Sequence, residues 1–264
     1  MSYSYTIREL ELSINSVCNL RCRECGFFTP NQPKASMTDD IIGEHLNSLK
    51  ILEKEKIEIL SLAILGGEPT LTSLHLEKAA CTFSKLGNIK NIEVVSNGLY
   101  PQGLTLNTLK SINKLSISVY IKDEVFIYAW KNFVIKNAPD VKLEFRIEKL
   151  WDKTTGNYFV PKDRAQTFYK ECWYKMHCAT LERSRLFICS RAAKLQNDFD
   201  GLLLTDNTKS SDIINYLTRD ECLSSCQTCV PSMKLGKVQG GHQPNTISIQ
   251  AMMNTAIDYL NSYS

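Results

Sequence analysis

Between residues 10 and 150, short apolar runs alternate with amphipathic stretches, and this alternation constrains the fold more than any other feature. Strands are predicted over residues 10–16, 57–67, 91–98, 114–120 and 141–148. Helices are predicted between them over residues 37–52, 72–87, 104–112 and 123–135. Apolar strands separated by helices form a parallel sheet. Five strands are too few for a closed eight-stranded barrel, so we predict an α/β fold with an open, partial (β/α) barrel.

After residue 150 the sequence becomes more polar and irregular. This part carries six of the ten cysteines, with a predicted hairpin over residues 180–189 and a predicted helix over residues 210–217. We therefore predict two domains. The partial barrel occupies residues 1–160, and a small cysteine-rich domain with a C-terminal tail occupies residues 161–264.

Composition and charge exclude several classes of protein. The chain has 31 basic and 28 acidic residues and no basic cluster, so nucleic-acid binding is not predicted. No apolar run approaches the ~20 residues of a membrane span. The N-terminus has no signal-peptide pattern, and a cytoplasmic protein is expected. In that setting, ten cysteines in 264 residues indicate metal binding rather than disulfides.

Three of the cysteines lie close together after the first predicted strand. Cys18, Cys22 and Cys25 have the spacing CxxxCxxC. Three thiolates can bind three irons of a cubane [4Fe–4S] cluster and leave the fourth iron open to a ligand that is not protein. A zinc site with a fourth ligand from elsewhere, such as His45 or a late cysteine, is the alternative. Both interpretations are compatible with the spacing.

Further polar or glycine-rich segments follow the other strands. They are Gly66-Gly67-Glu68-Pro69, Ser96-Asn97-Gly98, Ser118 and Arg146. Because the carboxyl ends of parallel strands meet at one mouth, these segments are expected to share a site with the three cysteines. Each also has an ordinary structural interpretation: a turn for the two glycine segments, a barrel-interior residue for Ser118 and a salt bridge for Arg146.

Taken together, the CxxxCxxC and GGEP segments resemble the radical S-adenosylmethionine (SAM) superfamily over roughly residues 8–150. The resemblance implies that the three cysteines bind a [4Fe–4S] cluster whose open iron chelates SAM. Reductive cleavage of SAM would then release a 5′-deoxyadenosyl radical that abstracts a hydrogen atom from a substrate. It also implies a flavodoxin- or ferredoxin-type electron donor. The implied SAM contacts are Gly66, Gly67, Glu68, Ser96, Asn97, Ser118 and Arg146.

One position departs from the pattern of the superfamily. An aromatic residue usually precedes the third cysteine and lies near the adenine, whereas this chain has Glu24 there. Phe27 and Phe28 follow the third cysteine, and Phe27 is the candidate for packing against the adenine.

The late cysteines are similar in arrangement to the twitch domain, a shortened SPASM domain found on some radical SAM enzymes. By this resemblance Cys178, Cys189, Cys226 and Cys229 bind an auxiliary [4Fe–4S] cluster. Zinc is the alternative metal, and Cys172 or Cys222 can replace one ligand. Cys81 is expected to be a buried apolar residue. Cys172 and Cys222 are either structural thiols or candidate hydrogen-atom donors to a substrate radical, and donation would make the reaction an epimerisation rather than an oxidation.

The substrate is the least determined feature. Short twitch-bearing chains resemble enzymes of carbohydrates and aminocyclitols, which favours a small polar substrate, such as a sugar or nucleotide sugar, and an epimerase or dehydrogenase. A peptide-modifying maturase is the main alternative. A glycyl-radical activating enzyme and an electron carrier fit the motifs less well. His177, Arg183, Arg191 and the tail over residues 236–245 can line the pocket or lie on the surface. Gly240-Gly241 can be a hinge or part of a loose end.

Overall fold

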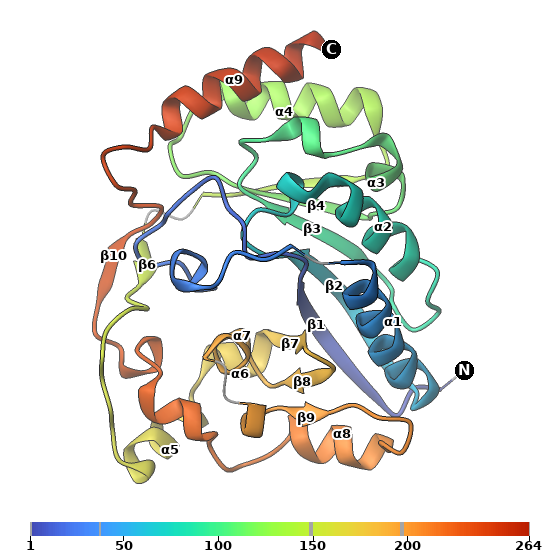
Figure 1. Cartoon of the computed structure of the whole chain (residues 1–264), viewed down its shortest axis with the longest axis vertical. Coiled ribbons are helices and arrows are strands. Elements are labelled where there is room, and N and C mark those ends of the chain that lie inside the picture. The colour runs from blue at the N-terminus through green and yellow to red at the C-terminus, as the bar shows by residue number, and fades with distance from the viewer. Residues whose placement is uncertain (1, 37, 148–149, 196–197, 264) are drawn as a thin grey trace.

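The computed structural model describes residues 2–36, 38–147, 150–195 and 198–263. Within these residues, eight strands form one sheet in the order β5-β4-β3-β2-β1-β7-β8-β9 (Figure 1). The strands of this sheet are β1 (Tyr5–Ser13), β2 (Ile57–Leu65), β3 (Ile92–Ser96), β4 (Lys114–Ser118), β5 (Lys142–Arg146), β7 (Ala179–Glu182), β8 (Arg185–Phe187) and β9 (Leu202–Leu203). A separate ribbon pairs β6 (Leu150–Asp152) with β10 (Lys237–Gln239) in antiparallel fashion.

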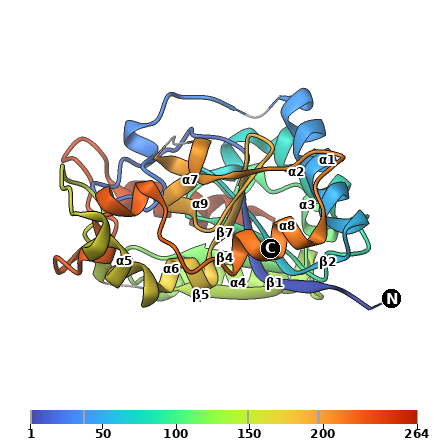
Figure 2. The same ribbon diagram turned by 90° about the horizontal axis from the view of Figure 1, so that it is seen from below.

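Helices connect the parallel strands and cover the outer side of the sheet (Figures 1 and 2). The first four are α1 (Asp39–Lys54), α2 (Ser73–Phe83), α3 (Leu106–Lys110) and α4 (Glu124–Asn137). The helices after β5 are not part of this set: α5 (Lys162–Lys170), α6 (Trp173–His177), α7 (Ser190–Lys194), α8 (Ser210–Leu217) and α9 (Ile249–Ser262). No helix in the described ranges is long and apolar enough to cross a membrane.

The five N-terminal strands confirm the predicted α/β fold with a parallel sheet. Strands β1 to β5 lie side by side in chain order, and each pairs in parallel with the next. The predicted helix over residues 210–217 coincides with α8. Met37 and Glu148, at the ends of two predicted elements, lie outside the described residues.

The late part of the chain continues the same sheet. β7 pairs in parallel with the free side of β1, with Leu10 opposite Ala179 and Leu12 opposite Leu181. β7 and β8 form the predicted hairpin. Backbone hydrogen bonds therefore join the two predicted domains, and their division near residue 160 remains a prediction.

Side chains along β1 alternate between two environments. Leu10 and Leu12 are fully buried in the main core together with Leu49 and Leu52 of α1. Glu9 and Glu11 face the inner side of the sheet, where they line a cavity. Because successive side chains of a strand point to opposite faces, one strand supplies both the core and the wall of the cavity.

Candidate functional site

A cavity of about 380 Å³ lies at the carboxyl ends of the parallel strands. Its wall contains every residue predicted for the first site: Cys18, Cys22, Cys25, Phe27, Gly66, Gly67, Glu68, Ser96, Asn97, Ser118 and Arg146. We call it the three-cysteine cavity. The structure thus brings these residues together, whereas their roles as ligands remain predictions.

The cysteine loop presents its thiols to this cavity in a largely buried setting. The backbone N–H of Leu20 donates to Cys18 Sγ at 3.4 Å, and Nε2 of Gln243 donates to Cys22 Sγ at 2.9 Å. Burial raises the pKa of Cys18 to about 12 and that of Cys22 to about 11. Metal binding would have to release these protons, because the thiolate is the form that ligates metal.

The glycine pair after β2 is packed against the backbone that leads into the cysteine loop. A Cβ atom at Gly67 would overlap the carbonyl oxygen of Val17, and one at Gly66 would lie 2.6 Å from that of Asn15. The N–H of Gly67 donates to the Asn15 oxygen at 2.9 Å. Only residues without a Cβ allow this approach. The pair therefore holds the cysteine loop against β2, and its contact with SAM remains a prediction.

Glu68 is 1% exposed, and both of its carboxylate oxygens accept hydrogen bonds from the protein. One oxygen accepts from the Ser96 and Thr70 hydroxyls at 2.7 Å, and the other accepts from the N–H of Asn97 at 2.7 Å. Burial raises the pKa of Glu68, although these donors oppose the effect. Glu68 thus fixes the end of β3 to the end of β2, in addition to any contact with the ammonium of SAM.

Arg146 and Ser118 line the same cavity from β5 and β4. Nη2 of Arg146 donates to Oε1 of Glu93 at 2.7 Å, and the Ser116 hydroxyl donates to the same oxygen at 2.6 Å. Arg146 therefore forms a salt bridge inside the sheet, which was one of its two interpretations. A role in binding the SAM carboxylate remains a prediction.

Glu24, the departure from the superfamily pattern, joins the cysteine loop to the chain that follows β6. Its Oε2 accepts from the backbone N–H groups of Thr154 and Thr155, both at 2.8 Å, and from their hydroxyls. Burial opposes ionisation of Glu24, but these hydrogen bonds prevail and lower its pKa. The position is used to anchor the loop.

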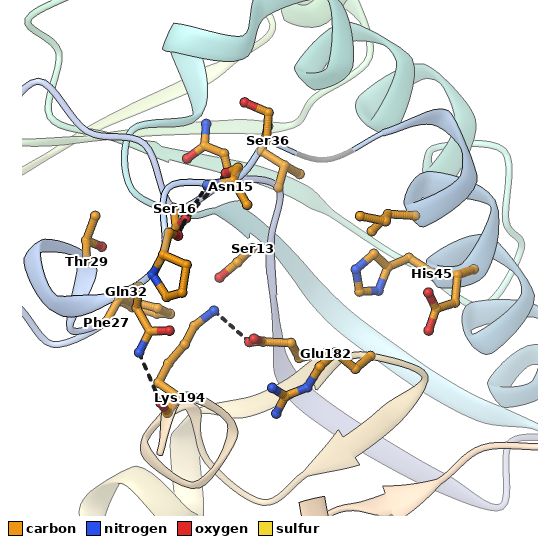
Figure 3. Close-up of a pocket in the computed structure, with 17 residues that line it drawn as sticks. Ser13, Asn15, Ser16, Phe27, Thr29, Gln32, Ser36, His45, Glu182 and Lys194 are labelled. Atoms are coloured by element: carbon orange, nitrogen blue, oxygen red, sulfur yellow. Dashed lines mark hydrogen bonds and ion pairs between the residues drawn. The ribbon is translucent and has the colours of Figure 1, made fainter. Parts of the chain in front are cut away.

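Phe27 separates the three-cysteine cavity from a second cavity of about 330 Å³. Figure 3 shows Phe27 and His45 on opposite sides of this second cavity, with the Lys194–Glu182 ion pair between them. Burial lowers the pKa of His45 to about 4, and its Nδ1 has no hydrogen-bond partner among the described residues. Because His45 does not line the three-cysteine cavity, the alternative zinc site with His45 as a ligand gains no support.

The late cysteines are grouped differently from the prediction. A small cavity of about 20 Å³, here called the four-cysteine cavity, is lined by Cys172, Cys189, Cys226 and Cys229. Cys178 lines the three-cysteine cavity instead. Cys172 precedes α6 and Cys178 follows it, and the charges of Cys172 and Cys189 act on Cys178, so Cys178 lies near these thiols although it lines the other cavity.

The remaining thiols lie outside both cavities. Cys222 is buried and donates its S–H to the Lys162 carbonyl at 3.9 Å. Cys81 is only partly buried and interacts with the Ser111 hydroxyl at 3.1 Å, so it is less buried than expected. None of the ten cysteines forms a disulfide. In the described ranges, no group of three or more His, Cys, Asp or Glu side chains is arranged to hold a single metal ion.

Sequence reasoning missed several residues of the three-cysteine cavity, notably Glu9, Glu11, Ser190 and the position of Cys178. Burial, and then the charge of Glu9, raises the pKa of Glu11 to about 8. Burial and the charges of Glu11 and Glu9 also raise the pKa of Cys178. The signal in the sequence was the pair Glu9 and Glu11, two carboxylates two residues apart in a buried strand, which therefore point to the same face of the sheet.

The C-terminal tail lies along the cysteine loop. The N–H of Arg23 donates to the His242 carbonyl at 3.0 Å, and the N–H of Arg21 donates to Oε1 of Gln243 at 2.6 Å. Gly241 has a φ of +68°, and a Cβ there would overlap the ring of Tyr120. The tail therefore packs against the cysteine loop in this structure, and the role of Gly240-Gly241, a hinge or part of a loose end, stays a prediction.

Comparison with known proteins finds partial relatives. No protein-family model matches the chain. It is 35% identical over 92 residues to the GTP 3',8-cyclase of Actinobacillus pleuropneumoniae serotype 3 (strain JL03), which is 34% of this chain and 25% of that protein. It is 28% identical over 123 residues to the GTP 3',8-cyclase of Actinobacillus succinogenes, which is 46% of this chain and 34% of that protein. The matches thus span a quarter to a third of the length of these relatives.

Solved structures with a similar chain course include BtrN in complex with AdoMet and 2-DOIA, with a TM-score of 0.47, 13% identity and coverage of 81% of this chain and 83% of that one. Native anSMEcpe with bound AdoMet has a TM-score of 0.43, 12% identity and coverage of 97% and 96%. The resemblance to the radical SAM superfamily rests on the cysteine and glycine segments of the sequence.

Proposed function

We propose that the chain is a radical SAM enzyme that acts on a small polar substrate, with a sugar or nucleotide sugar favoured. The observation that carries the proposal is the three-cysteine cavity, which combines the cysteine loop with the ends of β2, β3, β4 and β5. The name of the relatives, GTP 3',8-cyclase, supports a nucleotide portion in the substrate.

In this proposal Cys18, Cys22 and Cys25 hold a [4Fe–4S] cluster, and the open iron binds SAM. The donor set fits, because one buried thiol and two partly buried thiols line one cavity, and a cubane held by three thiolates needs a fourth ligand from outside. When bound, these groups supply one-electron cleavage of SAM to methionine and a 5′-deoxyadenosyl radical, which takes a hydrogen atom from the substrate. Glu11 and Ser190 in the cavity wall offer hydrogen-bonding groups for substrate hydroxyls, and the buried Thr180 hydroxyl donates to Glu11 from behind the wall.

The auxiliary [4Fe–4S] cluster is assigned to Cys172, Cys189, Cys226 and Cys229. This set differs from the sequence prediction in one ligand, with Cys172 in place of Cys178. Its support is the shared lining of the four-cysteine cavity. The charge of Cys229 also acts on Cys172, Cys189 and Cys226, as expected of thiols that lie near one another.

Cys178 replaces Cys172 and Cys222 as the proposed hydrogen-atom donor. It is 6% exposed and lines the cavity in which the substrate would be activated. Its S–H bond breaks as a new C–H bond forms on the substrate radical, which leaves a thiyl radical. One electron from a flavodoxin- or ferredoxin-type donor and one proton restore the thiol. A thiol in this wall favours epimerisation over dehydrogenation.

Anaerobic reconstitution tests the cofactor part of the proposal. Two [4Fe–4S] clusters correspond to about eight iron and eight sulfide per chain. The C18A/C22A/C25A variant should retain about four of each, and the C226A/C229A variant should also retain about four. The reduced wild type should convert SAM to 5′-deoxyadenosine, and the first variant should not. A cluster-loaded wild type that forms no 5′-deoxyadenosine contradicts the proposal.

Solvent deuterium tests the donor. A set of nucleotide sugars is incubated with the enzyme in D₂O, and the product is examined for deuterium at the reacting carbon. Wild type and C222A, the control for a buried thiol outside the cavity, should incorporate deuterium. C178A should still form 5′-deoxyadenosine without deuterated product. Equal deuterium incorporation by C178A and wild type excludes Cys178 as the donor.

A further inference from the structure

Arg191 is a buried cation with unused hydrogen-bond donors. The residue is 3% exposed and belongs to α7. Its guanidinium carbon lies 5.3 Å from the ring centre of Phe28 and 5.1 Å from that of Tyr174. Within the described residues, its Nε and Nη1 have no hydrogen-bond acceptor. Buried unpaired charges and donors cost free energy, so a partner for this group is expected.

Nearby charges do not supply this partner. Two other cations of the three-cysteine cavity already have carboxylates: Arg146 pairs with Glu93 at 2.7 Å, and Lys237 pairs with Asp152 at 2.7 Å. The carboxylate of Glu24 is occupied by Thr154 and Thr155. The ring contacts of Arg191 with Phe28 and Tyr174 stabilise a cation, and Arg191 also forms a side-chain hydrogen bond with Tyr174, but its Nε and Nη1 donors stay unused. An anionic acceptor from outside the polypeptide fits this environment.

The position of Arg191 indicates which anion this is. Tyr174 and Arg191 line both the three-cysteine and the four-cysteine cavity, so they form the wall between the two. Arg191 follows Cys189 by two residues, and a Cβ at Gly26, next to Cys25, would lie 3.9 Å from its Nη2. Sulfur atoms of a thiolate-ligated cluster are anionic acceptors, and hydrogen bonds to them and nearby charge set its reduction potential.

We propose that Arg191 is a positioning residue for the cluster of the four-cysteine cavity, with its free N–H donors directed to the sulfur atoms. This inference rests on the proposed function. Reduction adds negative charge to the cluster, and a buried cation stabilises the reduced form. Arg191 therefore raises the reduction potential of the auxiliary cluster and, less strongly, that of the cluster in the three-cysteine cavity.

Redox titration of the reconstituted enzyme, monitored by EPR, tests the inference. The variants are R191M, which removes the charge, and R191K, which keeps it but loses the fork of donors. R185M is the matched control, because Nη1 of Arg185 donates to the Gly201 carbonyl at 3.0 Å and Arg185 lines neither cavity. We expect R191M to shift the reduction equilibrium of the auxiliary cluster at least tenfold toward the oxidised form, about 59 mV for one electron. R191K should shift it less, and R185M should match wild type.

Other outcomes separate this inference from competing ones. Unchanged potentials in a fully loaded R191M overturn it, and a raised KM in that variant then assigns Arg191 to an anionic group of the substrate. Both Arg191 variants can also lose the auxiliary cluster. This loss supports the inference if the metal-free variants unfold at the same urea concentration as the metal-free wild type. It overturns the inference if they unfold at a lower urea concentration. A wild type without two clusters is a failure of the proposed function itself, visible before any variant is made.

Discussion

Glu68 shows at the scale of single residues that a carboxylate expected to bind a ligand is also engaged by the protein. Its oxygens accept from Thr70, Ser96 and Asn97, all within the cavity wall or next to it. Arg146 is engaged in a similar way by Glu93. Residues of the site therefore hold one another in place before any cofactor binds, which is how a site acquires a fixed geometry.

Glu68→Gln should destabilise the protein. The amide places a donor where one oxygen accepted, so at least one buried N–H or hydroxyl loses its acceptor, at a cost of about 1–3 kcal/mol. Urea unfolding of the metal-free protein measures this cost. Glu77→Gln is the control, because Glu77 accepts from Thr105 and Asn107 at the surface. Equal effects of the two substitutions would show that burial of Glu68 is unimportant.

Glu11 gives a prediction about pH. Its pKa is raised from 4.5 to about 8, mainly by burial. Between these values the folded protein retains a proton that the unfolded chain has released, so the free energy of unfolding falls as pH rises. The glutamine in Glu11→Gln cannot ionise, so this variant should lack the part of the pH-dependent decrease in unfolding free energy that Glu11 causes. At about 1.4 kcal/mol per pKa unit, that part amounts to a few kcal/mol.

Urea unfolding of the metal-free protein from about pH 5 to pH 9 checks this prediction. The exposed carboxylate of Glu124 provides the control, and Glu124→Gln should retain the wild-type pH dependence. Parallel pH profiles for wild type and Glu11→Gln would refute it.

At the scale of elements, the cavity depends on where strands end and what their ends contact. The end of β2 approaches the backbone of residues 15–17 through Gly66 and Gly67. Cys172 and Cys178 flank the short helix α6, and they line different cavities although the charge of Cys172 acts on Cys178. The resemblance to the twitch domain had suggested Cys178 as a ligand, with Cys172 or Cys222 as a possible replacement, and the sequence alone does not say which of these thiols shares a cavity with Cys189, Cys226 and Cys229.

Gly67→Ala tests the close approach of β2 to the cysteine loop. The new Cβ would overlap the Val17 carbonyl oxygen, and because the clash is with backbone we expect a loss of roughly 2–4 kcal/mol in the free energy of unfolding. Gly43→Ala in α1 is the matched control. A Cβ there meets nothing within 4 Å, so it should stabilise the protein by about 0.5–1 kcal/mol. Similar effects of the two substitutions would be inconsistent with the structure.

At the scale of the whole molecule, a segment from the late part of the chain packs against the cysteine loop. β1 pairs with β2 on one side and with β7 on the other. β10 pairs with β6, and the tail after β10 contacts Arg21, Cys22 and Arg23. The helix α9 then packs along α4 at the top of Figure 1. The loop that carries the first three cysteines is therefore held by segments more than 200 residues away in sequence.

Gln243→Leu should loosen the cysteine loop. The substitution removes the acceptor of the Arg21 N–H and the donor to Cys22 Sγ. We expect faster amide hydrogen exchange in a peptide that covers residues 19–25, with little change in the strands. Gln250→Leu in α9 is the control, since Gln250 contacts Asp123 and Asn254 instead. Unchanged exchange in the loop would mean that the tail does not hold it.

Much of the fold and the first site could be predicted because the information is local. A period of two or 3.6 in hydrophobicity identifies strands and helices, and a parallel sheet brings its strand ends to one edge. Cys18, Cys22 and Cys25 lie on one loop, so their proximity follows from their spacing. The elements β6, β9, β10, α5, α6, α7 and α9 were not predicted, because most are short and their partners are distant in sequence.

The amino-acid order alone was enough to place a thiol-rich loop and glycine-rich strand ends at one mouth of an α/β sheet, because these relations need only the chain direction and the repeat of each element. Packing between distant segments decided the rest. It assigned Cys172 rather than Cys178 to the small cavity, paired Arg146 with Glu93, and left Arg191 buried between two groups of cysteines. Such choices depend on contacts across the fold, and no local pattern encodes them.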